Sequence, residues 1–253
     1  MIFSGFEGLA WFMASLLFFL LVQRWLHREL QAVFLLLTRK PALSIGLFSL
    51  VFFPGVLLHE ASHFIMARLL QVRTGGFSLI PKVLPNGTLR LGYVETAATD
   101  VFRDALIGTA PLISGAAVVG LLGATRLGFL PLADFTGQGQ WQTVLAHVPA
   151  MVRQPDFWLW FYLAFAISST MLPSNSDRRA WLPMGIGFGI LLILAGIAGA
   201  GPWMMSHLGP ALNRFLLSLG LVFGLSLALH VLLVIPVWGL RHAISRLTGL
   251  RVV

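Results

Sequence analysis

The feature that most constrains this chain is the length of its charge-free segments. Six stretches contain no Asp, Glu, Lys or Arg, namely residues 8–23, 41–58, 105–125, 157–176, 180–213 and 215–240. A helix needs about 20 mostly apolar residues to cross the hydrocarbon core of a bilayer. Because backbone groups in lipid must be hydrogen-bonded within the protein, such stretches are expected to be helical. The sequence therefore predicts an all-α polytopic membrane protein with about six transmembrane helices.

The composition excludes the other classes to which a chain of 253 residues could belong. Charged residues make up 10% and hydrophobic residues 57% of the chain, whereas soluble domains are roughly one quarter charged and disordered chains are poor in large apolar residues. The net charge of +8 lies mostly between the apolar stretches, where Lys and Arg orient helices and contact anionic lipids. We therefore expect the lipid bilayer as a partner and no nucleic acid. Without cysteine, a metal would need His, Asp or Glu ligands.

Three parts follow one another along the chain. Residues 1–40 are expected to hold the first transmembrane helix and then, at 25–38, an interfacial amphipathic segment that is too short and too charged to cross the membrane. Residues 41–180 are expected to form a catalytic core of three helices, the first of which continues to about Leu70. Residues 181–253 are expected to hold two C-terminal transmembrane helices.

A β-hairpin is predicted between the second and third helices, at residues 77–94. Apolar residues alternate on both sides of Pro85-Asn86-Gly87, and Asn-Gly between alternating apolar residues is typical of a hairpin turn. Since an unpaired sheet edge cannot face lipid, the hairpin is expected at the interface, against protein, or beside a wet cavity.

The segment His59-Glu60-Ala61-Ser62-His63 carries the strongest chemical signal in the sequence. It is an HExxH motif, in which two imidazoles one helical turn apart can bind one metal ion and the carboxylate beside them can act on a metal-bound water. Glu60 is the only acidic residue inside a predicted span, where an ionisable group is costly unless it is paired or binds a metal. We therefore expect one Zn²⁺ per chain, with Glu60 as the general base and acid of peptide-bond hydrolysis. A polar cluster that only packs helices is the alternative.

Catalytic zinc usually has three protein ligands, so a third is needed. Asp177 follows the fourth charge-free stretch, and the second and fourth helices are expected to run in the same direction. His59, His63 and Asp177 would then lie towards the same side of the membrane. The alternative for Asp177 is a loop carboxylate that is neutralised by Arg178 and Arg179.

These residues resemble the site-2 proteases, zinc metalloproteases that cut transmembrane or membrane-proximal segments of other proteins. The likeness covers residues 54–177 and includes the HEASH segment, the hairpin and a small-residue stretch at 108–115, which is similar to the family's Ala-Gly-Pro-Leu element. The resemblance implies a transmembrane protein substrate and places Asp177 at the position of the family's third ligand. The family's Asn-Pro…Asp-Gly signature is replaced by Pro173-Ser174-Asn175-Ser176-Asp177-Arg178, and there is no room for a PDZ or CBS domain. The chain is therefore interpreted as a minimal, divergent member.

Further roles are expected for residues around this motif. A substrate helix must unwind before attack, and the hairpin strand that contains Leu89 and Leu91 would hold the unwound segment by β-augmentation; a structural plug over the site is the alternative role. Asn175 or Ser114 would hydrogen-bond the substrate backbone or the oxyanion. His230 is expected to form an interhelical hydrogen bond.

Two other functions stay open at this stage. Glu95 could be the third ligand, as in membrane zinc proteases that process prenylated or misfolded proteins, although Glu95 and Asp100 are five residues apart instead of that family's four. The other function is that of a zinc-binding membrane scaffold or transporter without proteolysis. The intact Glu60 argues against it, because a purely structural site does not need a general base. The excess of Lys and Arg in the loops on the N-terminal side favours an active site towards the cytoplasmic side, whereas the basic residues that follow the first span favour the reverse orientation.

The family likeness indicates a prokaryotic cytoplasmic membrane.

Overall fold

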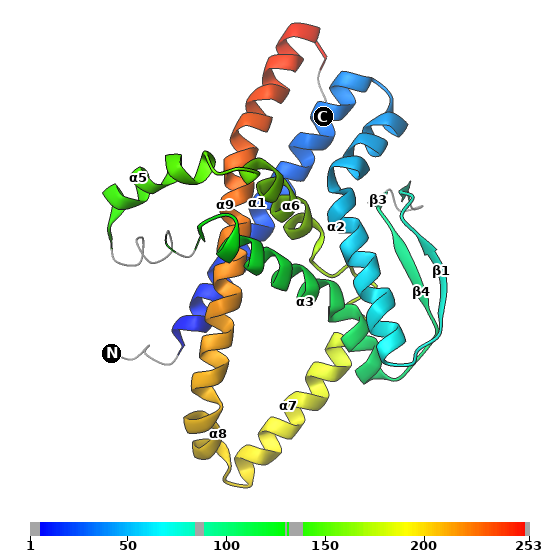
Figure 1. Cartoon of the computed structure of the whole chain (residues 1–253). Helices are drawn as coiled ribbons and strands as arrows, with labels where there is room; N and C mark the ends of the chain where they lie inside the picture. Colours follow the sequence, from blue (N-terminus) through cyan, green and yellow to red (C-terminus); the bar gives the residue numbers. More distant parts are fainter. Residues whose placement is uncertain (1–5, 84–88, 130, 132–138, 251–253) are drawn as a thin grey trace.

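The protein is mostly helical in its computed structural model, which describes residues 6–83, 89–129, 131 and 139–250 (Figure 1). Four helices in this part are long and apolar enough to cross a membrane: α1 (Glu7–Thr38), α2 (Pro41–Leu69), α3 (Val101–Thr125) and α9 (Gly209–Thr248). A fifth candidate span is the bent pair of α7 (Trp181–Ile197) and α8 (Gly201–His207). These helices are those of an integral membrane protein, as the sequence predicts, with four or five candidate spans in the described part where about six were expected.

The difference in the number of spans arises in the second half of the chain. The predicted fourth span is the helix α6 (Phe157–Thr170), whose 14 residues are fewer than a full crossing needs. The predicted fifth span is broken between α7 and α8, which meet at a bend of 113°. Gly199 between them has a φ of 83°, a conformation that favours glycine. α5 (Trp141–Val152) precedes α6.

Helix α1 is longer than the sequence suggested and continues without a break through residues 25–38, where a separate interfacial segment was expected. Two polar side chains of this long helix, one of them within residues 25–38, have partners in other helices. The Gln23 side chain donates a hydrogen bond of 2.6 Å to the Ser169 carbonyl of α6, and Glu29 forms a salt bridge of 2.9 Å with Arg241 of α9. Glu60 is therefore not the only acidic residue inside a long apolar helix. The helix ends where Arg39 adopts a left-handed conformation with φ 53°.

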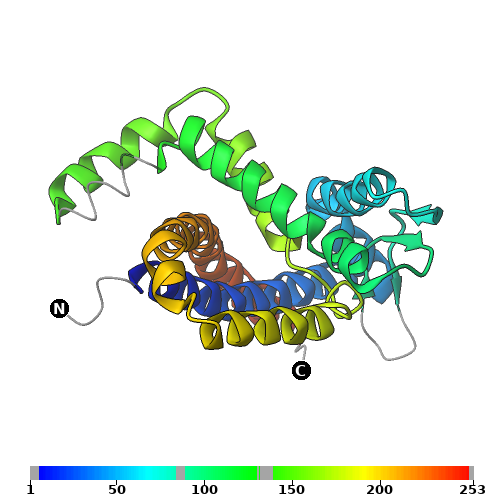
Figure 2. The same cartoon turned by 90° about the horizontal axis from the view of Figure 1, so that it is seen from below.

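The predicted β-hairpin is present between α2 and α3, and it is longer than 77–94. Strand β1 (Thr74–Ser78) pairs with β4 (Tyr93–Thr96), and β2 (Lys82–Val83) pairs with β3 (Leu89–Arg90), both antiparallel. The predicted turn at 85–87 lies outside the described residues. Figure 1 shows the hairpin beside α2, and Figure 2 shows it at one edge of the molecule.

The helices around α2 form the framework of the candidate site. Helices α1 and α9 lie side by side over much of their length, while α2 packs against α1, α3 and α6 (Figures 1 and 2). A buried apolar cluster joins four of these helices through Leu26, Phe48, Phe52, Val56, Phe165 and Val234. His230 of α9 is fully buried and its Nε2 lies 2.9 Å from Ser169 Oγ of α6, which confirms the predicted interhelical hydrogen bond.

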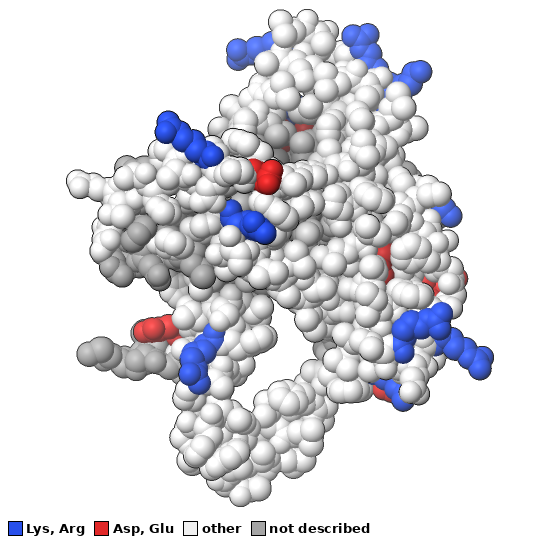
Figure 3. Space-filling model, in the orientation of Figure 1, with Lys and Arg blue, Asp and Glu red and all other residues white. Residues whose placement is uncertain are grey.

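Helices α7 and α8 stand away from this framework. Neither contains a buried residue, and Figure 3 shows the arm that they form almost without charged side chains. In the same view, Lys and Arg side chains gather at the upper end of the molecule and at the lower right. The uncharged surface of this arm suits contact with lipid.

Candidate metal centre

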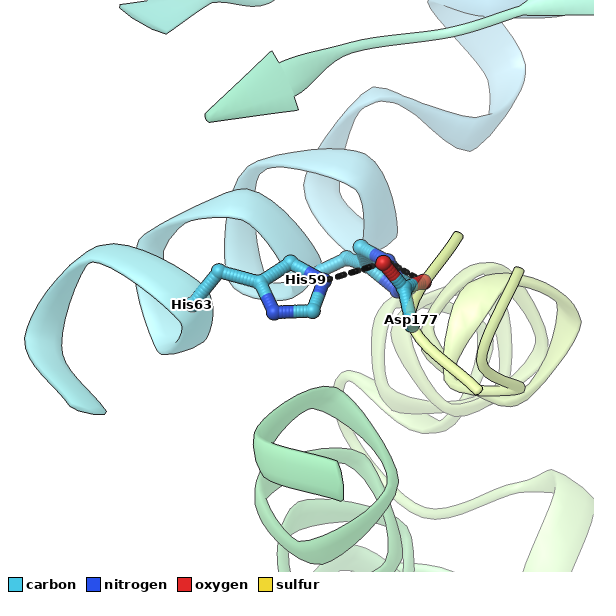
Figure 4. Close-up of side chains that lie close together, drawn as sticks. All are labelled: His59, His63 and Asp177. Carbon is cyan, nitrogen blue, oxygen red and sulfur yellow. Dashed lines mark hydrogen bonds and ion pairs between the residues drawn. The ribbon is translucent and has the colours of Figure 1, made fainter. Parts of the chain in front are cut away.

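His59, His63 and Asp177 come together at one point of the structure (Figure 4). The two histidines lie four residues apart on α2, one helical turn, so their side chains share a face. Asp177 lies in the loop that connects α6 to α7, and its carboxylate faces both imidazoles. One ligand atom from each residue lies within 4.8 Å of the other two, so the group could hold a metal ion.

Hydrogen bonds to two backbone carbonyls orient the imidazoles. His59 Nδ1 lies 2.7 Å from the Thr170 carbonyl oxygen, and His63 Nδ1 lies 2.8 Å from the Ile107 carbonyl oxygen. Since a carbonyl oxygen only accepts, each Nδ1 carries a proton, and in the neutral form of each ring the lone pair is then on Nε2. This arrangement is common for histidines that bind metals, because it fixes the tautomer and the direction of the ring.

The distances among the donor atoms fit a tetrahedral ion. The two Nε2 atoms are 3.2 Å apart, the His59 Nε2 lies 3.7 Å from Asp177 Oδ2, and the His63 Nε2 lies 3.5 Å from Asp177 Oδ1. Two ligands bound to tetrahedral zinc at about 2.0–2.2 Å are about 3.3–3.6 Å apart. Two lone pairs and a carboxylate at these separations favour a cation among them. Two imidazoles and one carboxylate are therefore a donor set that could hold a metal ion, and sets of this kind are used for Zn²⁺.

The Asp177 carboxylate is held in place by its own loop. The Ser174 N–H donates a hydrogen bond of 2.7 Å to Asp177 Oδ2. Burial alone would raise the pKa of the Asp177 carboxyl, but its interactions with His59, His63 and Ser174 hold this pKa well below its usual range. The group is therefore ionised, as a metal ligand must be.

Helix α3 packs against the loop that carries Asp177. A Cβ built on Gly108 would overlap the Asp177 carbonyl, so only a glycine lets the loop lie this close to the helix. In the first turn of α3, Asp104 accepts two hydrogen bonds of 2.7 and 2.6 Å from the Arg179 guanidinium. This pair ties the chain two residues beyond the metal ligand to α3. Arg178 instead contacts Asn175 at 2.6 Å, so neither arginine forms a salt bridge with Asp177 in the described structure.

Glu60 is buried beside the metal ligands and lies under the hairpin. A Cβ built on Gly92 would lie 2.9 Å from Glu60 Cγ and 3.0 Å from its Oε1. The backbone between β3 and β4 can therefore approach the carboxylate only because residue 92 has no side chain. Glu60 offers a proton acceptor within one helical turn of both imidazoles.

A cavity of about 1100 Å³ opens over the three ligands and Glu60. Its wall includes the hairpin from Arg90 to Thr96 and the polar loop before α7. His59 lies ten residues before the end of α2, which corresponds to about 15 Å along a helix. The cavity therefore reaches residues that lie ten positions inside a long apolar helix.

The other residues singled out in the sequence have different positions. Asn175 and Leu91 line the cavity, as does Glu95, whose Oε2 accepts a hydrogen bond of 3.2 Å from the Gly76 N–H. Glu95 does not belong to the group of ligands found among the described residues. Ser114 donates to the Pro111 carbonyl of its own helix and is not among the residues that line the cavity. The side chain of Leu89 lies outside the described part of the structure.

Sequence reasoning missed the supporting residues of the site. The Thr170 and Ile107 carbonyls, Gly92, and the pair of Asp104 with Arg179 carry no recognisable spacing relative to the motif. The small-residue stretch 108–115 is visible in the sequence, and Gly108 within it lies against the backbone of Asp177 in the structure.

Comparison of the chain with models of protein families, with curated proteins and with solved structures found no match. The site is therefore interpreted from its own geometry.

Proposed function

We propose that this protein is an intramembrane zinc endopeptidase, which hydrolyses peptide bonds in or near transmembrane segments of other proteins. The observation that carries the proposal is the convergence of His59, His63 and Asp177 beside the buried Glu60, inside a cavity. A site that only bridges helices would need neither a free carboxylate next to the ligands nor open space above them. The resemblance to site-2 proteases agrees with the same assignment.

Each residue has a distinct task in this proposal. His59, His63 and Asp177 would hold Zn²⁺, which when bound lowers the pKa of water and polarises a carbonyl group. Glu60 would take a proton from the attacking water and deliver it to the leaving amine. The Thr170 and Ile107 carbonyls keep the imidazoles in the tautomer that binds metal.

The hairpin supports a role in substrate binding. Strand β4 pairs with β1 on one side, and among the described residues no strand pairs with its other edge. Residues 90–96 line the cavity, so an extended segment could add to this edge through backbone hydrogen bonds while its carbonyl faces the ligands. We propose that a substrate helix unwinds to bind in this way.

The finer membrane topology is also part of the proposal. α6 contains 14 residues and would cross only part of the bilayer. Its C-terminal end leads into the loop that carries Asp177. Together with the broken pair α7–α8, this would give the six segments expected from the sequence, in a prokaryotic cytoplasmic membrane with the site towards the cytoplasm.

Cleavage by purified protein in proteoliposomes tests the proposal. A panel of single-span substrate proteins is incubated with zinc-loaded wild type and with the Glu60→Gln variant, and products are identified by mass spectrometry. We expect wild type to cut within or beside a transmembrane segment, and the variant to be slower by about 10²–10⁴-fold with its zinc retained. Zinc binding without cleavage of any substrate would contradict a protease and favour a scaffold or transporter.

A further inference from the structure

Two cations face each other across the hairpin. Lys82 of β2 and Arg90 of β3 are register partners in the antiparallel pair. Like charges directly opposite each other on neighbouring strands repel and destabilise the pair. Neither residue forms a salt bridge with a carboxylate in the part of the chain that the structure describes.

One aromatic ring partly offsets this repulsion and orients the two side chains. The Arg90 Cζ lies 4.5 Å from the centroid of the Tyr93 ring, and the Lys82 Nζ lies 5.7 Å from the same centroid. The Arg90 Nε also donates a hydrogen bond of 3.3 Å to the Gly92 carbonyl. The guanidinium is thus fixed by a ring and a carbonyl, while its terminal N–H groups have no carboxylate partner among the described residues. A fixed arginine of this kind is suited to bind a carboxylate through two hydrogen bonds.

The position of Arg90 connects this cation pair to the candidate metal centre. Arg90 and Tyr93 line the cavity that also contains His59, Glu60 and Asp177. Gly92, which accepts from Arg90, is the residue that lies against Glu60. Along an extended chain, two residues correspond to about 7 Å. Arg90 also interacts electrostatically with Glu60, so an anion held by Arg90 would lie in the same part of the cavity as the proposed general base.

We propose that Arg90, with Lys82 and Tyr93, forms a subsite for an acidic side chain of the substrate, within about two residues of the scissile bond. The inference rests on the proposed protease function and adds its specificity. Glu60 is near enough to Arg90 to interact with it electrostatically without forming a salt bridge, so an acidic side chain of the bound peptide would be the carboxylate that pairs directly with the terminal N–H groups of Arg90. A lipid phosphate is the competing anion, but the Gly92 carbonyl orients Arg90 on the wall of the cavity that also contains the candidate metal ligands, which favours the peptide.

Binding experiments can test this subsite without cleavage. The probes are single-span peptides in neutral detergent micelles, each with one Asp placed at successive positions through the polar flank and the adjoining turn, and matched peptides with Asn instead. Affinities are measured with the full-length, zinc-loaded Glu60→Gln protein. At one position we expect the Asp peptide to bind about tenfold more tightly than its Asn counterpart, the size expected for one charge-assisted interaction.

Variants of Arg90 in the same background identify the residue responsible. Arg90→Gln should abolish the preference for Asp, Arg90→Lys should keep part of it, and Arg90→Glu should reverse it in favour of Lys at the same position. Arg103→Gln is the matched control, because Arg103 pairs with Asp100 at 3.4 Å outside the cavity. An unchanged zinc content shows that each variant is folded at the site.

Several results would overturn the inference. Equal binding of every Asp and Asn pair, or a preference that persists in Arg90→Glu, would show that Arg90 does not select an acid. A response to anionic lipid in the micelles, lost in Arg90→Glu and independent of peptide charge, would assign the cations to lipid. Failure of the protease proposal would give a different result. A preference for Asp without any cleavage by wild type would support the peptide-binding subsite and contradict only the proposed enzymatic activity.

Discussion

Two glycines set the distance between the backbone and the candidate metal centre. Gly108 lets the loop that carries Asp177 lie directly on α3, and Gly92 lets the hairpin lie directly on Glu60. Their effects on function should differ, because one glycine positions a metal ligand and the other borders the proposed general base.

Gly108→Ala should weaken metal binding. The added methyl group would overlap the Asp177 carbonyl, so the loop must move and take the carboxylate away from the imidazoles. We expect zinc affinity, measured by competition with a chelator, to fall by about 10–100-fold, as for other losses of ligand support. Gly120→Ala on the same helix is the control, since its Cβ would meet only Val222 Cγ2, at 3.3 Å. Equal affinities of the Gly108 variant and wild type would contradict this role of the glycine.

Gly92→Ala should leave zinc bound and slow cleavage. The methyl group would press on the Glu60 side chain at 2.9–3.0 Å without reaching a ligand, so the carboxylate or the hairpin must shift. We expect the rate of cleavage to fall by at least about tenfold with an unchanged zinc content, because proton transfer depends closely on geometry. Gly46→Ala, where the new Cβ has open space, should behave as wild type. A parallel loss of zinc would show that Gly92 supports the whole site and not Glu60 alone.

At the scale of elements, the site depends on contacts between segments that are far apart in sequence. α2 supplies both histidines, the loop after α6 supplies the aspartate, and α3 holds that loop through Gly108 and the pair of Asp104 with Arg179. The buried Glu29 joins α1 to α9 through Arg241. The ion pair between Asp104 and Arg179 should matter for metal binding, and the ion pair between Glu29 and Arg241 should matter for the free energy of unfolding.

Arg179→Met should lower zinc affinity by about tenfold, because the loop beyond Asp177 loses its attachment to α3. Asp104→Asn should have a similar effect, and the double variant should be no worse than either single variant, since all three break one contact. Arg103→Met, which breaks only the exposed pair with Asp100, is the control. Additive losses in the double variant would show that the two side chains act separately.

Arg241→Met should destabilise the protein by about 3 kcal/mol, because it leaves the buried Glu29 carboxylate without its counter-charge. The double variant Glu29→Gln with Arg241→Met should recover most of this loss. The free energy of unfolding is measured by titration with a denaturing detergent in mixed micelles. Arg214→Met, at an exposed position on the same helix, should change it by less than about 0.5 kcal/mol. No recovery in the double variant would mean that Arg241 acts through packing.

At the scale of the whole molecule, the parts that follow from local spacing could be predicted and those that depend on distant contacts could not. The HExxH spacing fixes two imidazoles on one helix face, and the expected direction of successive helices predicted Asp177 near them, as the structure has it. The length of α1 could not be predicted, since Glu29 and Gln23 are stabilised by residues 212 and 146 positions away. The ion pair between Asp104 and Arg179 could not be predicted either, because the two residues are 75 positions apart in the sequence. The bend between α7 and α8 could not be predicted, because the residues of both helices form one continuous apolar stretch.

The central claim is that one zinc ion is bound by side chains from α2 and from the loop after α6. Zinc content per chain, measured by atomic absorption after purification of wild type and three variants, tests it most directly. The account predicts one zinc ion per chain in wild type, Glu60→Gln and Glu95→Ala, and its loss in Asp177→Ala. Retention of zinc by Asp177→Ala, or its loss in Glu95→Ala with Asp177 intact, would contradict the account.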